Sequence, residues 1–125
     1  MIDFVNKGLF KLAPIPEKDM HGSVRDLLVD GEVVLQAFSS MRDQVIFTSK
    51  RVIAANVQGV IGKKIDFTSI PYRKINTYSV ETAGLLDLEC ELELWISEVG
   101  KVRFEIRGSF DIVKLNKAIS TYALD

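Results

Sequence analysis

The chain has 125 residues with 16 basic and 17 acidic side chains, and 47% of its residues are hydrophobic. This length and composition are typical of one globular domain and exclude an intrinsically disordered chain. The net charge of −1 argues against a general nucleic-acid binder, which needs a strong basic excess. The opening residues lack a secretory signal and no run of about 18 apolar residues is present, so we expect a cytoplasmic protein.

Residues 1–31 are expected to form a helical segment that packs on the domain formed by residues 32–125. Apolar residues recur at the spacing of one helical face between residues 17 and 29, at Met20, Val24, Leu27 and Leu28. Pro14-Ile15-Pro16 interrupts regular structure before this stretch, and Asp30-Gly31 is a stop signal after it. The pattern therefore predicts one N-terminal helix and places the first strand after that helix.

The chain then changes to the period of strands, and about seven are predicted. Strand-forming residues separated by turn signals cover residues 33–39, 44–48, 51–57, 64–67, 72–81, 88–97 and 102–107. Pro71 lacks a backbone donor, so we expect strand pairing to start after it. The clearest alternation lies in residues 88–97, where apolar side chains alternate with Glu89, Glu91, Glu93 and Trp95. Such a strand fits an antiparallel sheet with one wet face.

A helix is predicted to end the chain. Ser109 is a candidate N-cap, and apolar residues follow at helical spacing at Ile112, Leu115, Ile119 and Tyr122. Seven strands in one flat sheet would leave long exposed edges. We therefore expect a mainly β fold, a partly closed barrel of antiparallel strands in two near-orthogonal sheets, capped by this helix.

Two segments resemble a known family. Residues 43–53 form two strands around Thr48-Ser49-Lys50-Arg51, and residues 66–75 contain Ile70-Pro71-Tyr72. With the alternating strand, the final hairpin and the last helix, they resemble the small bacterial pleckstrin-homology (PH) domain proteins. The resemblance implies a PH-like fold, no enzymatic activity and no cofactor. It also implies a cyclic homo-oligomer, a pentamer, that interacts with a further, unidentified protein.

The candidate interaction surface consists of charged residues and one tryptophan. Basic residues concentrate at Lys63, Lys64, Arg73 and Lys74, and acidic residues line one strand face at Glu89, Glu91 and Glu93. If the last hairpin pairs Ile96 with Val102, Trp95 faces Arg103, which permits a cation–π contact. One interpretation is a solvated face whose charges balance within the chain. The other is that acidic and basic strips of neighbouring subunits meet head to tail, with Trp95 as the anchor.

An alternative function is a peripheral membrane module that binds anionic lipid headgroups. Eukaryotic relatives that bind phosphoinositides carry a basic cluster in the matching loop, but residues 39–43 here contain only Arg42 beside Asp43. Enzyme signatures are weak: His21 is the single histidine, Cys90 is the single cysteine, and residues 59–64 lack the spacing of a phosphate-binding loop. We therefore predict no catalytic, metal-binding or cofactor-binding residues.

Overall fold

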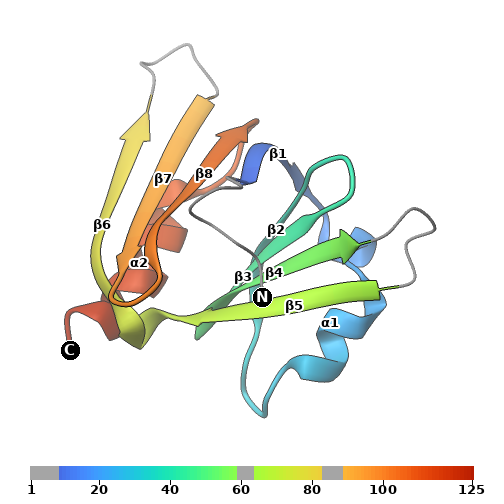
Figure 1. The fold of residues 1–125 in the computed structure, drawn as a ribbon, viewed down its shortest axis with the longest axis horizontal. Coiled ribbons are helices and arrows are strands. Elements are labelled where there is room, and N and C mark those ends of the chain that lie inside the picture. Colours follow the sequence, from blue (N-terminus) through green and yellow to red (C-terminus); the bar gives the residue numbers. More distant parts are fainter. Residues whose placement is uncertain (1–8, 59–63, 83–88) are drawn as a thin grey trace.

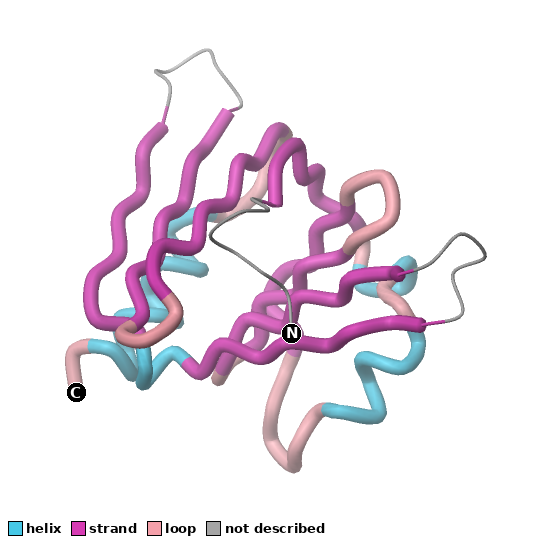
Figure 2. Tube along the Cα trace, in the orientation of Figure 1, coloured by secondary structure: helices cyan, strands magenta, loops and turns pink. Residues whose placement is uncertain are grey.

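The computed structural model describes residues 9–58, 64–82 and 89–125, and strands dominate it (Figures 1 and 2). The strands are β1 (Leu9–Ile15), β2 (Val34–Ser39), β3 (Gln44–Thr48), β4 (Arg51–Gln58), β5 (Lys64–Pro71), β6 (Ile75–Thr82), β7 (Glu89–Ile96) and β8 (Gly100–Arg107). The helices are α1 (Gly22–Leu27) and α2 (Ile112–Ala123), with short 3-10 turns η1 (Glu17–Asp19) and η2 (Tyr72–Lys74). The mainly β fold with a C-terminal helix is confirmed.

The described strands form one continuous sheet in the order β5-β4-β3-β2-β1-β8-β7-β6. The sheet bends, so that β6, β7 and β8 run steeply across β3, β4 and β5 (Figure 1). The two sheets expected from the sequence are therefore the two halves of one sheet, joined through β1. All neighbouring strands are antiparallel except β1 and β8, which are parallel.

Strand β1 differs from the prediction, which placed no strand before the first helix. It pairs antiparallel with β2 near Pro14 and parallel with β8 near Leu9 and Leu12. Lys11, at φ 60, lies where the register with β8 shifts. The strand was missed because a proline and this irregularity conceal its period. Whether residues 1–31 fold as a separate segment stays a prediction, but β1 is hydrogen-bonded to strands on both sides.

Helix α1 is six residues long and shorter than predicted. Met20 and Val24 pack on Ala37, Ile46 and Ile53, which lie on the outer face of β2–β4. Both faces of β3 and β4 are consequently covered, which explains their unbroken apolar sequences.

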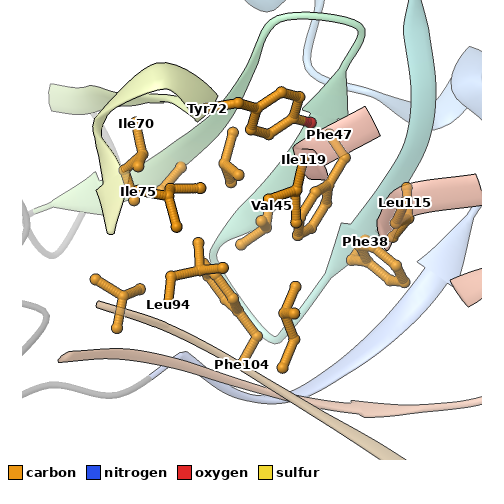
Figure 3. Close-up of a cluster of buried hydrophobic side chains, with 14 of the residues drawn as sticks. Phe38, Val45, Phe47, Ile70, Tyr72, Ile75, Leu94, Phe104, Leu115 and Ile119 are labelled. Atoms are coloured by element: carbon orange, nitrogen blue, oxygen red, sulfur yellow. The ribbon is translucent and has the colours of Figure 1, made fainter. Parts of the chain in front are cut away.

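The main core lies on the inner side of the bend (Figure 3). Phe38 and Phe47 come from one half of the sheet, and Leu94 and Phe104 come from the other. From α2, Leu115 and Ile119 pack into the same cluster. The inward alternation predicted for β7 is confirmed, since Cys90, Leu92, Leu94 and Ile96 are all buried.

Two local predictions are wrong. The N-cap of α2 is Asp111, whose carboxylate accepts from the backbone N–H of Lys114 at 3.0 Å, and not Ser109. Strand pairing does not start after Pro71, because β5 already pairs with β4 and ends at Pro71 opposite Arg51. A proline is tolerated there because β5 is an edge strand and needs no donor on its open side.

Candidate interaction surface

A buried polar network joins the two segments that carried the family resemblance. The Glu32 carboxylate is fully buried and accepts from Arg51 Nε at 2.9 Å and Arg51 Nη2 at 3.0 Å. It also accepts from the Thr48 hydroxyl at 2.6 Å and from the Val29 N–H at 3.0 Å. Burial alone would raise the pKa of Glu32, but hydrogen bonds from Arg51, Thr48 and Val29 outweigh it and lower that pKa.

Thr48 connects this network to the corner between the two halves of the sheet. Its hydroxyl accepts from the backbone N–H groups of Lys50 and Arg51, which closes the β3–β4 turn. The Tyr72 hydroxyl donates to the Thr48 carbonyl at 2.7 Å. Tyr72 is fully buried, and burial raises the pKa of its hydroxyl. These motif residues therefore stabilise the bend of the sheet. Glu32 was missed from the sequence because its partners lie far along the chain.

The outer face of β6, β7 and β8 carries the predicted acidic residues. The register pairs Glu89 with Arg107, Glu91 with Glu105, Glu93 with Arg103, and Trp95 with Lys101. This register differs by two residues from the one assumed above, because Ile96 pairs with Gly100 and not with Val102. Positive φ values of 74° at Glu98 and 104° at Gly100 permit the tighter turn. Trp95 consequently faces Lys101, and the expected pairing of Trp95 with Arg103 is wrong.

Each of the three predicted acidic residues has a basic partner on β8. Arg107 contacts Glu89, Arg103 contacts Glu91 and also Glu105 at 2.9 Å, and Lys101 lies 3.7 Å from Glu93. The hydrogen bond that Arg103 donates to the Glu91 carboxylate is the main cause that raises the pKa of Arg103. The acidic and basic side chains of this face therefore largely neutralise one another. Because the net charge of the face is small, it attracts a basic partner only weakly at long range.

Trp95 is the large apolar side chain on this charged face. Its exposed fraction is 49%, and it borders a shallow hollow of about 390 Å³. Thr77, Ser79, Glu93 and Lys101 also line this hollow, which lies beside the edge strand β6. An exposed tryptophan surrounded by polar groups is typical of an anchor at a protein interface.

The predicted basic residues do not form one strip. Lys64 begins β5, whereas Arg73 and Lys74 follow its other end in η2, about 20 Å away at the usual rise of a strand. All three are exposed, and the Arg73 guanidinium lies over the Tyr122 ring at 5.7 Å. Lys63 lies outside the described residues.

The structure separates the residues considered for chemistry. His21 caps α1, where its Nδ1 accepts from the Ser23 N–H at 3.2 Å, and its ring contacts Phe67 on β5. Cys90 is buried on β7, and burial raises the pKa of its thiol. Within the described ranges, no group of three or more His, Cys, Asp or Glu side chains is placed to hold a metal ion.

Asp43 fixes the loop at residues 39–43, which was considered above for lipid binding. Its carboxylate accepts from Asn56 Nδ2 at 2.8 Å and from the Val57 N–H at 3.3 Å. Met41, at the tip of the loop, is 98% exposed. No helix in the described part of the chain has the length and apolarity needed to cross a membrane.

Comparisons with known proteins agree with this geometry. The sequence model of the family described as "Bacterial PH domain" matches residues 3–123. The uncharacterized protein YjqA of Bacillus subtilis (strain 168) is 37% identical over 121 residues, which cover 95% of this chain and 93% of YjqA. A DUF1696 family protein with a pleckstrin-homology domain from Shewanella loihica PV-4 has a similar structure, with a TM-score of 0.72 and 33% identity. That match covers 94% of this chain and 99% of the other.

A second solved structure, a pleckstrin homology domain from Shewanella amazonensis SB2B, matches with a TM-score of 0.58 and 41% identity. That match covers 82% of this chain and 84% of the other.

Proposed function

Because the chain belongs to the bacterial PH domain family, we propose that it is a non-enzymatic protein–protein interaction module that self-assembles into a cyclic homo-oligomer. The observation that supports this proposal is that the described sheet ends in two different open edges, β5 and β6. An open edge presents unpaired backbone N–H and C=O groups that can pair with another chain. A contact between two different patches, repeated head to tail, closes into a ring when the rotation between subunits fits. By resemblance, we expect a pentamer.

The outer face of β6, β7 and β8 is the surface that such an assembly would present to a further protein. Trp95 supplies an apolar anchor, and the ion pairs around it supply a polar rim. Because those charges are already paired, shape and hydrogen bonding would select the partner more than net charge.

Native mass spectrometry of the purified protein tests the self-assembly. We expect one closed oligomer whose mass is a whole multiple of the 14.0 kDa chain. Analytical ultracentrifugation over a range of concentrations provides the second measurement. A protein that stays monomeric at high micromolar concentration would refute the ring.

A second candidate function is binding of anionic lipid headgroups through residues 40–43. The observation that favours it is the exposed Met41 beside Arg42, because an apolar tip next to a cation suits a membrane surface. Vesicle flotation with and without phosphoinositide tests it. Absence of salt-sensitive binding to the anionic vesicles would remove this candidate.

A further inference from the structure

The two open edges differ in how well they are protected against pairing. Strand β6 contains no proline, lysine or arginine, which are the residues that commonly protect edges. Its Tyr78 and Val80 are half-buried on the core side, and Glu81 is exposed on the outer side. No ion pair of Glu81 occurs among the described residues. Strand β6 therefore lacks the residues that would hinder the addition of another strand.

Strand β5 offers a complementary set of side chains. Ile65 and Phe67 are half-buried on the face that packs toward α1, and Lys64 and Thr68 alternate with them on the other face. Lys64 is exposed. Pro71, the residue least able to pair, lies at the opposite end of the strand.

We propose that β6 of one copy pairs antiparallel with β5 of the next copy, with Glu81 opposite Lys64. This inference rests on the proposed self-assembly and names the strands and the register of its contact. With Glu81 opposite Lys64, Val80 faces Ile65, Tyr78 faces Phe67 and Thr77 faces Thr68. The register therefore joins one opposite charge pair, two apolar pairs and one threonine pair, which are favourable cross-strand neighbours, and it places Ser79 opposite Asp66.

Other pairings of the same two strands match less well. In the sheet, β5 and β6 run in the same direction. If the strands of two copies paired in parallel, the core-side residues of β6 would lie beside the core-side residues of β5. Tyr78 and Val80 would then lie against polar residues. Those polar residues are Lys64, Asp66 and Thr68. An antiparallel slip of two residues would place Glu81 opposite Asp66, which is repulsive.

The pairing leaves Pro71 outside the contact. In this register the paired stretch covers residues 77–81 and 64–68 and ends before the irregularity between Ile75 and Thr77. Along this stretch the open backbone groups of both edges would be satisfied, and the half-buried apolar side chains of both strands would be covered. In strand addition the backbone hydrogen bonds supply affinity and the side-chain contacts supply specificity.

Disulfide cross-linking tests the register directly. In a Cys90→Ser background, the pair Glu81→Cys and Lys64→Cys should form an interchain disulfide under mild oxidation, visible as a ladder of multimers on non-reducing gels. The control pair Glu81→Cys and Asp66→Cys should cross-link far less, because diagonal neighbours lie beyond disulfide range. An intrachain bond is not expected, because the start of β5 and the end of β6 lie on opposite sides of the molecule (Figure 1). The mass of the oxidised product distinguishes a single chain from cross-linked chains.

Charge exchange gives an independent measurement. Glu81→Lys and Lys64→Glu should each weaken self-association roughly fivefold to tenfold at each contact, because like charges then lie opposite each other. The double variant should restore association to nearly the unmodified level. Circular dichroism of each variant verifies folding, and both sites are exposed.

The possible outcomes separate the two proposals. An oligomer that forms without the 64–81 cross-link and without rescue by charge exchange would refute the register and leave the proposed self-assembly standing. A monomeric unmodified protein would refute both. Preferential 64–81 cross-linking together with rescue supports the pairing of β6 with β5.

Discussion

Replacement of Arg51 by alanine is expected to destabilise the fold strongly, because it leaves the Glu32 carboxylate buried without its cation. Glu32 would lose two charge-assisted hydrogen bonds from Arg51, at 2.9 and 3.0 Å. Removing one partner of a buried ion pair costs about 3–5 kcal/mol. The Arg51 side chain is 21% exposed, so water can enter the vacated space, and we expect a cost near the lower end, about 3 kcal/mol.

This cost depends on pH. The folded-state pKa of Glu32 lies below its unfolded value, so its stabilising contribution is present above the unfolded pKa and is lost as pH falls through the folded pKa. In Arg51→Ala the pKa of Glu32 should rise, because the hydrogen bonds and the charge of Arg51 that lower it are removed while burial, the largest single cause, still raises it. The difference between Arg51→Ala and the unmodified protein should therefore shrink on acidification.

Urea unfolding, followed by circular dichroism at about pH 7 and about pH 4, measures both effects, since this range approaches the ordinary titration of glutamate. Protein concentration is kept constant, because self-assembly would add to stability. The matched control is Arg25→Ala, which breaks the half-exposed pair with Glu17 and should cost less than about 1 kcal/mol. If Arg51→Ala were no more destabilising than this control, the network would not stabilise the bend as argued.

Two further substitutions test neighbouring contacts. Tyr72→Phe keeps the buried ring but removes the donor to the Thr48 carbonyl, and thermal or urea unfolding should show a loss of about 1–2 kcal/mol. An unchanged midpoint would show that the hydroxyl contributes nothing. Asp111→Ala removes the N-cap of α2 and should cost about 1 kcal/mol in the same assay, whereas Ser109→Ala should be close to neutral. The reverse order of these two variants would contradict the capping assignment.

Local patterns were sufficient to predict most strands and the last helix. In β7 the buried residues alternate with polar ones because only one face is wet, so period two was visible in the sequence. In α2 the buried residues Leu115 and Ile119 are four positions apart, so the helical period was also visible in the sequence. Strand β1 carries no such signal, because its pairing with β8 joins residues far apart in the sequence, such as Leu9 and Phe104.

The candidate surface was predictable in composition but not in its contacts. Glu89, Glu91 and Glu93 could be placed on one face from sequence, yet their partners depend on the register of β7 and β8. That register depends on the backbone conformation of the turn at Glu98 and Gly100. The alternation of apolar and polar residues along the two strands does not predict this conformation. The Glu32 network was invisible for a related reason, since its acceptor and donors come from separate turns.

The parallel pairing of β1 with β8 also has a consequence for how the protein is made. Leu9 can pair with Phe104 only after the chain has been synthesised as far as β8. Hairpins in each half can form early from local contacts, but the seam between the halves must close last and slowly, since distant segments have to meet. Until then the side of β1 that faces β8 and the side of β8 that receives β1 are open, so the nascent chain carries two temporary edges that invite misassembly with other nascent chains.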